Sequence, residues 1–175
     1  MTTVEDILRL LKNRSAKDTA LIEKAYLFSE KAHAGQKRFS GEPYFNHITT
    51  VTIHLAKLGM DVSTVVAGLL HDSMEDAGIS LSEIKKEFGT DVAFLVQGVT
   101  KLGKLKYRGL DRHAESLRKF FIAVAEDIRV VVIKLADRLH NVSTLEFVPE
   151  GKRKRIAEET LGIYAPIADR LGMGK

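Results

Sequence analysis

Helix-length segments separated by short, glycine-marked breaks occupy nearly the whole chain, and this pattern limits the fold more than any other feature. Prolines are few, at Pro43, Pro149 and Pro166, so little in the sequence interrupts a helix. Apolar residues recur at helical intervals between the breaks, as in residues 20–32. The breaks fall at residues 35–41, 59, 77–78, 89, 102–109 and 148–151. The sequence therefore predicts an all-α fold, with one compact multi-helix domain over residues 1–175.

Two of the predicted helices lie on either side of Gly89. Ser80 and Glu83 have the spacing of a capping box, which predicts the start of a helix that ends at Phe88 and Gly89. The apolar segment 91–102 predicts the next helix.

The run from Val130 to Ile133 is ambiguous, because four β-branched residues favour a strand and so short a run has no decisive periodicity. The wider window 128–142 favours a helix, since its polar residues are spaced i, i+3, i+4 and i+7. These residues form one stripe, here called the polar seam: Lys134, Asp137, Arg138 and Asn141. The rest of this helix is apolar, with Val131, Val132, Leu135 and Leu139. We expect a buried helix whose seam meets charged or polar partners, because unpaired buried charge is costly.

Length and composition exclude several kinds of protein. The 175 residues, 45% of them hydrophobic, are enough for one real core. Without Cys there are no disulfides, thiolate ligands or cysteine nucleophiles, so metal ligands must be His or carboxylate. No apolar run approaches the roughly 18 residues of a membrane span, and the N-terminus has no cleavage pattern. We expect a soluble, cytoplasmic protein without a membrane partner. Its formal charge of +4 does not indicate direct nucleic-acid binding but favours a small polyanion.

The chemically richest segment is GLLHDSMEDAG, residues 68–78. In a helix, Asp72, Glu75 and Asp76 share one face because they are spaced i, i+3 and i+4, and Glu75 lies one turn from His71. Three carboxylates so close together repel one another. The cluster therefore predicts a bound cation.

Further ligands for that cation come from two distant segments. His47 follows a loop marked by glycine and proline and is expected to open a helix, which aims its imidazole into a cleft. Asp137 lies on the polar seam. The predicted metal ligands are His47, His71, Asp72 and Asp137. Two His and two carboxylates suit one six-coordinate divalent ion such as Mn²⁺ or Fe²⁺, with Zn²⁺ less favoured.

The ordered set His47, His71-Asp72 and Asp137 resembles the signature of the HD superfamily of metal-dependent phosphohydrolases. More narrowly, five segments resemble consecutive blocks of the hydrolase domain of RelA/SpoT-type alarmone enzymes: residues 32–47, 67–80, 95–102, 128–145 and 156–173. The resemblance implies an all-helical fold. It also implies Mn²⁺-dependent removal of the 3′-diphosphate of guanosine 3′,5′-bis(diphosphate) (ppGpp) or pppGpp in stringent-response control, giving GDP or GTP and pyrophosphate.

The resemblance also implies roles for individual residues. The four predicted ligands match the metal ligands of the family, and Glu75 and Asp76 match an acidic pair implicated in hydrolysis. The residues that match the substrate-binding loop and pocket wall are Arg38, Ser40, Lys134, Arg138, Asn141 and Thr144. Two positions depart from the family pattern. Ile48 stands where Pro is frequent, and Phe39 stands where a basic residue is frequent, so the guanine contact need not be the same.

The charge of the substrate suggests how these residues act. A 3′-diphosphate repels an incoming hydroxide, so the metal must neutralise phosphate oxygen and lower the pKa of a water. Glu75 or Asp76 would take or relay the proton. Arg38, Lys134 and Arg138 would offset the remaining phosphate charge.

Other interpretations of the chain remain open at this point. It could be a regulatory nucleotide-binding module without turnover, or a related helical phosphohydrolase acting on NADPH or a nucleoside phosphate. Long members of the resembled family continue into synthetase and regulatory domains, so this chain is either a fragment of such an enzyme or a free-standing small hydrolase. The remaining histidines, expected to pack or lie at the surface, are His33, His54, His113 and His140.

Two basic stretches complete the list of candidates. Residues 101–113 predict a solvated loop, with steering of phosphate towards the site as the alternative. Residues 152–155 predict an exposed helical face.

Overall fold

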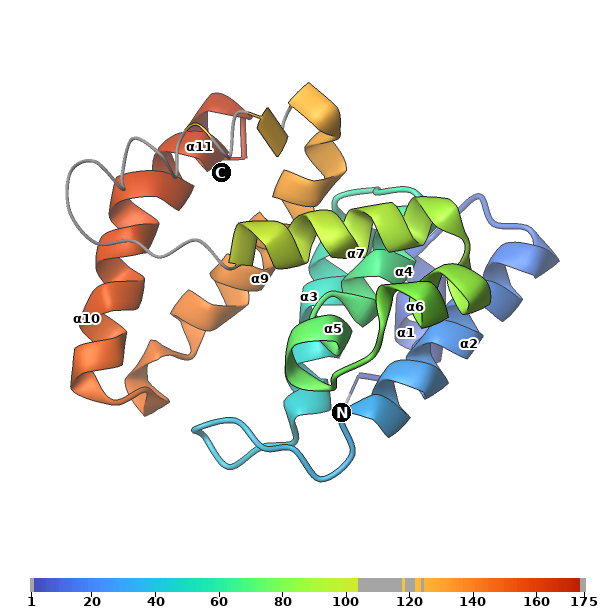
Figure 1. Ribbon diagram of the computed structural model, residues 1–175, viewed down its shortest axis with the longest axis horizontal. Helices are drawn as coiled ribbons and strands as arrows, with labels where there is room; N and C mark the ends of the chain where they lie inside the picture. The colour runs from blue at the N-terminus through green and yellow to red at the C-terminus, as the bar shows by residue number, and fades with distance from the viewer. Residues whose placement is uncertain (1, 104–117, 119–121, 124, 174–175) are drawn as a thin grey trace.

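The fold is all-α over the residues that the computed structural model describes, which are 2–103, 118, 122–123 and 125–173 (Figure 1). This confirms the predicted fold class. The β-type pairing recorded within these ranges is one isolated bridge between Lys37 and Pro43. In the described ranges no helix is long and apolar enough to cross a bilayer. The first helices are α1 Val4–Leu10, α2 Ala16–Ala32, α3 Tyr44–Lys57, α4 Val62–Leu70, α5 Ser73–Asp76, α6 Leu81–Phe88 and α7 Thr90–Gly103. The later ones are α9 Ile128–Ser143, η1 Leu145–Phe147, α10 Glu150–Glu159, η2 Thr160–Tyr164 and α11 Ala165–Arg170.

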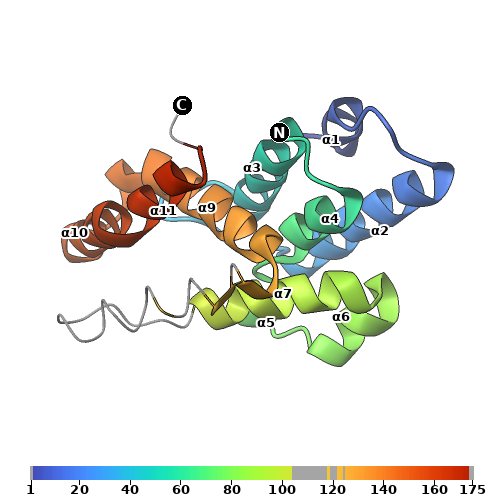
Figure 2. The ribbon, with the colours of Figure 1, turned by 90° about the horizontal axis from the view of Figure 1, so that it is seen from above.

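The core is built around α3, α4 and α9. Helix α3 packs against α4 and α9, while α4 also packs against α2 and α7, and α7 against α9. Figure 2 shows α5, α6 and α7 on one side of α9 and α1 to α4 on the other. Fully buried side chains from four helices meet in this core: Ile48, Leu55, Leu69, Leu95 and Ile133. This packing brings the first turn of α3, the C-terminal end of α4 and the middle of α9 close together.

Helices α6 and α7 form as the sequence predicts. Ser80 caps α6, because its hydroxyl accepts a hydrogen bond from the Glu83 amide at 3.2 Å. Gly89 ends the helix with a φ of 89°, a left-handed conformation that glycine adopts without strain. Helix α7 then begins at Thr90.

The segment around His71 departs from the predicted continuous helix. Helix α4 ends at Leu70, and the short α5 begins at Ser73, so His71 and Asp72 lie at the junction. One cause is local. The His71 imidazole donates a hydrogen bond from Nδ1 to the Gly68 carbonyl at 2.7 Å, and so competes with the backbone amide that would bond this carbonyl in a continuous helix. The predicted i+3 and i+4 relation survives, since the Asp72 carbonyl accepts from the amides of Glu75 and Asp76 at 3.1 and 2.8 Å.

Helix α3 begins three residues earlier than expected, at Tyr44 rather than His47. A narrow hairpin precedes it and protrudes at the bottom of Figure 1. The Arg38 amide bonds the Glu42 carbonyl and the Tyr44 amide bonds the Gln36 carbonyl, both at 2.9 Å. Gly41 has a φ of 84°, which allows the chain to reverse between these bonds. His47 therefore lies in the first turn of α3, and Arg38 lies on a closed loop beside it.

Helix α9 confirms the helical interpretation of residues 128–142, and Val131, Val132 and Leu135 are buried as expected. Leu139 was expected among the apolar residues that cover this helix, but its side chain is 57% exposed. The correction has a simple cause: α9 leaves the core towards its C-terminus, where α3, the hairpin and the α10–η2 segment cover other faces of the helix and leave Leu139 uncovered.

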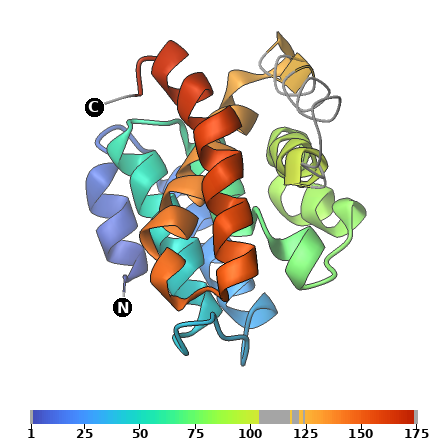
Figure 3. The same cartoon turned by 90° about the vertical axis from the view of Figure 1, so that its left-hand side faces the viewer.

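Helix α10, the π-helical turn η2 and α11 form one continuous but bent rod, which crosses the end of the molecule facing the viewer in Figure 3. Pro166 lies at the start of α11. It has no amide hydrogen to continue the helical bonding, which explains the irregular turn before it. The basic residues 152–155 lie exposed on α10, as predicted. Most of the other basic stretch, residues 104–113, lies outside the described residues, and so does His113.

Candidate metal centre and substrate cleft

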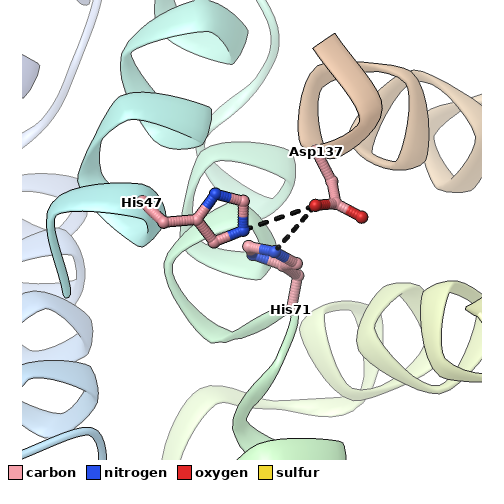
Figure 4. A group of neighbouring side chains, drawn as sticks. All are labelled: His47, His71 and Asp137. Carbon is pink, nitrogen blue, oxygen red and sulfur yellow. Dashed lines mark ion pairs between the residues drawn. The ribbon is translucent and has the colours of Figure 1, made fainter. Parts of the chain in front are cut away.

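Two imidazoles and a carboxylate from three parts of the fold converge in the core (Figure 4). His47 comes from α3, His71 from the α4–α5 junction and Asp137 from α9. One ligand atom of each lies within 4.8 Å of the others, and all three residues are buried. Asp137 Oδ1 is 3.3 Å from His47 Nε2 and 4.0 Å from His71 Nε2. This convergence brings together three of the four predicted metal ligands.

The His71 ring is oriented for a ligand on its inner nitrogen. Its Nδ1 donates to the Gly68 carbonyl, which leaves Nε2 without a proton when the ring is neutral. Nε2 is buried and makes no hydrogen bond with the described part of the chain. A buried nitrogen with a free lone pair, facing a carboxylate, fits a divalent cation.

Asp72, the fourth predicted ligand, adjoins both imidazoles. Its Oδ2 lies 3.1 Å from His71 Nε2 and 3.5 Å from His47 Nε2. The same oxygen accepts a hydrogen bond from the Tyr44 hydroxyl at 2.8 Å. Asp72 therefore adds a second carboxylate to the cluster, which matches the mixed nitrogen and oxygen set of the sequence prediction.

The electrostatics of the cluster favour positive charge at its centre. Burial alone would lower the pKa of His71, but the carboxylates of Asp72 and Asp137 outweigh it and raise that pKa to about 9. Burial would raise the pKa of Asp72, but His71 and His47 hold it well below its usual value. Both carboxylates are thus ionised at neutral pH, and a proton on His71 or a metal ion balances them.

The polar seam of α9 holds Asp137 in place. Burial opposes ionisation of Asp137, but the Lys134 ammonium, 2.8 Å from Oδ2, helps to keep its pKa below the usual range. The Asn141 amide donates to Oδ1. The seam therefore meets partners, as predicted, and Asp137 keeps one oxygen directed towards the imidazoles.

Glu75 and Asp76, the predicted proton-handling pair, are exposed and engage different neighbours. Asp76 Oδ2 accepts from the Tyr44 hydroxyl at 2.8 Å. Glu75 turns towards the end of α7, where a Cβ added to Gly103 would lie 2.8 Å from its Oε1 and 3.4 Å from Lys134 Nζ. The two acids thus occupy separate places at the edge of the cluster.

The hairpin residue Arg38 connects the loop to α9. Its guanidinium donates to Asn141 Oδ1 at 2.9 Å and to Thr144 Oγ1 at 3.0 Å. Since Asn141 also donates to Asp137, a chain of hydrogen bonds runs from the loop to the metal cluster. Of the six predicted substrate residues, the structure links Arg38, Asn141 and Thr144 directly.

A cleft of about 250 Å³ lies beside Arg38, between the hairpin and α10. Its lining combines basic, aromatic and aliphatic side chains: Lys37, Arg38, Phe39, Tyr44, Asn141, Val148, Lys152 and Ile156. Lys152 Nζ lies 4.9 Å from the centre of the Phe39 ring. A positive charge at the mouth and an exposed aromatic face suit a phosphorylated nucleoside.

Two predicted substrate residues have other contacts. The Ser40 hydroxyl donates to Glu42 at 3.4 Å within the hairpin. Arg138 pairs with Glu159 at 3.1 Å and lies 4.1 Å from the centre of the Tyr164 ring. These contacts tie α9 to the bent rod, so Arg138 positions α10 and η2 in the structure described.

The sequence interpretation did not single out Tyr44 and dismissed His140. Tyr44 bridges Asp72 and Asp76, and burial and these two carboxylates raise its pKa far above the usual value, so it remains a hydroxyl donor. His140 Nδ1 lies 2.8 Å from His47 Nδ1. Burial, followed by His47 and Arg38, lowers the pKa of His140 to about 4. Both residues lie one turn from a predicted ligand, Tyr44 before His47 and His140 after Asp137, and that spacing is the signal that could have identified them.

Residues 25–174 match the protein family described as the HD domain. The chain is 50% identical to a GTP pyrophosphokinase of Streptomyces antibioticus, over 97% of this chain and 21% of that protein. It is 48% identical to a guanosine-3′,5′-bis(diphosphate) 3′-pyrophosphohydrolase of Aquifex aeolicus, over 98% of this chain and 24% of that protein. The chain thus spans between a fifth and a quarter of the length of these relatives.

A solved structure shares the fold. It is described as a metazoan ortholog of SpoT that hydrolyzes ppGpp and plays a role in starvation responses. The two chains superimpose with a TM-score of 0.61 at 27% sequence identity, covering 82% of this chain and 81% of the other.

Proposed function

Because this chain belongs to the HD domain family, and within it to the domains of RelA/SpoT-type enzymes, we propose that it hydrolyses ppGpp or pppGpp and releases pyrophosphate from the 3′ position. The observation that carries the proposal is the buried cluster of His47, His71 and Asp137, in which His71 Nε2 has no hydrogen-bond partner among the described residues. Buried carboxylates in such a cluster require compensating positive charge, which a bound cation would supply.

We assign His47, His71, Asp72 and Asp137 as ligands of one divalent ion, with Mn²⁺ proposed as that ion. Two nitrogen and two carboxylate ligands leave room in a six-coordinate shell, which suits Mn²⁺ or Fe²⁺ better than tetrahedral Zn²⁺. When bound, the ion supplies Lewis acidity at a phosphate oxygen of the substrate.

We assign Glu75 and Asp76 as the residues that take or relay the proton of the attacking water. Hydrolysis adds the oxygen of water to phosphorus, breaks the bond to the ribose 3′ oxygen and leaves that oxygen with a proton. Both carboxylates are exposed at the edge of the cluster, where water reaches them. Tyr44 holds Asp76 beside Asp72 through its two 2.8 Å contacts.

We assign the predicted substrate-binding residues to contacts with the phosphates and the nucleoside of the substrate, or to the support of those contacts. Arg38 presents a guanidinium at the cleft, a group that makes paired hydrogen bonds to phosphate oxygens. Lys134 balances Asp137 and adds positive charge next to the cluster. Asn141 and Thr144 hold Arg38, and Ser40 lies two residues along the same hairpin. The role of Arg138 is indirect in this proposal, through its contacts with Glu159 and Tyr164.

The decisive experiment measures the release of pyrophosphate and of orthophosphate by metal-stripped protein, with and without added Mn²⁺, from ppGpp and from GDP and NADPH as comparison substrates. We expect Mn²⁺-dependent release of pyrophosphate from ppGpp alone. His71→Ala should abolish release while the protein stays folded by circular dichroism. His54→Ala, which removes a half-buried histidine of α3 outside the cluster, should retain it. Full turnover without metal, or preference for NADPH, would contradict the proposal.

The proposal concerns one activity of this domain in the cytoplasm. The matched segment covers 21% of the GTP pyrophosphokinase of Streptomyces antibioticus, so that relative is about five times as long as the segment. We propose that the synthetase and regulatory functions of such enzymes belong to other domains.

A further inference from the structure

We infer that His140 is a positioning residue that orients the metal ligand His47, through a hydrogen bond between the two Nδ1 atoms. The inference rests on the proposed metal centre and adds to it a residue outside the ligand set. The two nitrogens are 2.8 Å apart, and the ring centres are 4.9 Å apart with the planes inclined by 43°. This is the distance of a hydrogen bond rather than of a stacking contact.

The chemistry of the pair determines which ring donates. His47 faces Asp72 and Asp137 through Nε2, so Nε2 is the atom available to a metal. A neutral imidazole that coordinates through Nε2 carries its proton on Nδ1 and donates from there. His140 must therefore accept on its Nδ1 and carry its own proton on Nε2. In this way His140 selects both the tautomer and the orientation of the His47 ring.

The two histidine ligands differ in how they are held. His71 Nδ1 donates to a backbone carbonyl, that of Gly68 at 2.7 Å, which no substitution of a side chain removes. His47 Nδ1 depends on a side chain instead. Histidine ligands generally need such an outer partner, and its loss typically lowers metal affinity by roughly 10- to 100-fold. His47 is thus the ligand whose orientation this chain can lose by a single substitution.

His140 is itself fixed at the end of α9. Its carbonyl accepts the hydroxyls of Ser143 at 2.9 Å and Thr144 at 3.1 Å. Thr144 Oγ1 also lies 3.0 Å from the Arg38 guanidinium. These hydrogen bonds fix the last turn of α9, both within the helix and to the hairpin. The His140 ring therefore contacts α3 from a fixed backbone position, one turn beyond Asp137.

A matched pair of variants separates orientation from packing. His140→Asn keeps an acceptor, because the amide oxygen occupies nearly the place of Nδ1, whereas His140→Leu has a similar shape without an acceptor. Mn²⁺ affinity of the metal-stripped 175-residue protein is measured by calorimetry. We expect roughly 10- to 100-fold weaker binding for His140→Leu and at most about threefold for His140→Asn. His54→Leu, on the same helix as His47, should bind like the wild type.

A second readout uses the metal-free protein. Long-range ¹⁵N–¹H correlation spectra should show a hydrogen-bonded proton between the Nδ1 atoms of His47 and His140 in the wild type, and no such proton in His140→Leu. At saturating Mn²⁺, His140→Leu should regain most of its kcat. The variant would then differ from the wild type mainly in needing a higher Mn²⁺ concentration.

Several outcomes would overturn the inference. Wild-type affinity in His140→Leu would show that the bond does not matter, and equal losses in both variants would show that His140 acts by packing. Absence of a hydrogen-bonded proton between the two Nδ1 atoms in the wild type would also contradict it. If the wild type bound Mn²⁺ but did not hydrolyse ppGpp, only the proposed function would fail; if it bound no divalent metal, both would fail.

Discussion

The Tyr44 hydroxyl has one proton but lies 2.8 Å from two carboxylates, those of Asp72 and Asp76. It donates to one of them at a time, and in either case it keeps the two acids together at the edge of the cluster. The ring is held by a stacked contact with His33, with centres 5.3 Å apart. Tyr44 therefore connects a proposed metal ligand with a proposed proton carrier.

Replacing Tyr44 by Phe should slow ppGpp hydrolysis and lower the free energy of unfolding by no more than about 1.5 kcal/mol. The ring and its contact with His33 remain, whereas a charge-assisted hydrogen bond of roughly 1.5 kcal/mol is lost, which corresponds to about a tenfold lower kcat. Steady-state kinetics and thermal unfolding are the measurements. Tyr26→Phe is the control, because the Tyr26 hydroxyl bonds the distant Thr2 carbonyl. Equal kcat values for Tyr44→Phe and the wild type would show that the Tyr44 hydroxyl does not contribute to hydrolysis.

At this scale the sequence indicated the residues that meet in the buried cluster, but not the residues that support them. His71 was predicted from crowded charge, Asp137 from the polar seam and His47 from its place after a loop marked by glycine and proline, and these are properties of single segments. The bond between His140 and His47 depends on how α3 and α9 are rotated against each other, and a helical wheel of α9 alone does not contain that information. For the same reason, the contacts of Arg138 with Glu159 and Tyr164 were not predictable.

At the scale of elements, α7 and α9 approach each other closely where Gly98 faces Val130. A Cβ added to Gly98 would lie 2.7 Å from Val130 Cγ2 and 3.0 Å from Cγ1. Val130 is 3% exposed and β-branched, so it has little freedom to move aside. The glycine thus sets the distance between the helix that leads to Gly103 and the helix that carries Asp137.

Gly98→Ala should lower the free energy of unfolding by about 1–2 kcal/mol. Overpacking costs about 1–3 kcal/mol, which exceeds the gain of about 1 kcal/mol expected from alanine in a helix. Gly151→Ala in α10 is the matched control, because a Cβ there meets nothing within 4 Å, and it should leave stability equal or slightly higher. Urea denaturation measures both. Stabilisation by Gly98→Ala would show that α7 and α9 separate easily.

The helices themselves were largely predictable, because periodicity and caps are local. Helix α6 begins after Ser80 and ends at Gly89, as its capping residues predict. The polar seam correctly predicted α9 as a helix despite its run of β-branched residues. The break between α4 and α5 was not predictable in the same way. No glycine or proline lies at the break. It is accompanied by a hydrogen bond from the His71 side chain to the Gly68 carbonyl, and the spacing of apolar residues does not predict such a bond.

At the scale of the whole molecule, the metal cluster joins parts of the chain that are 90 residues apart. His47 lies on α3, His71 at the α4–α5 junction and Asp137 on α9, and these elements pack together in the core. A cation bound there interacts with the folded chain but not with an unfolded one in which the ligands are dispersed. Metal binding is therefore linked to global stability.

Mn²⁺ should accordingly raise the unfolding temperature of the metal-stripped protein. At a free metal concentration 100 times the dissociation constant, the added stability is about 2.7 kcal/mol, or roughly 5–10 °C for a domain of this size. Differential scanning calorimetry measures the shift. His71→Ala, which removes a ligand, should show little or none.

The shift should also grow with pH. The pKa of His71 is raised to about 9 by Asp72 and Asp137 against the effect of burial, so the stability that the proton contributes is complete below the ordinary value of about 6.5 and is lost as pH rises through about 9. A metal competes with this proton, and between pH 6.5 and 8.5 each unit should tighten apparent Mn²⁺ binding by nearly tenfold. The metal-induced shift should thus be larger at pH 8 than at pH 6.5. A shift independent of pH in this range would mean that His71 is not a ligand, even if the protein binds metal elsewhere.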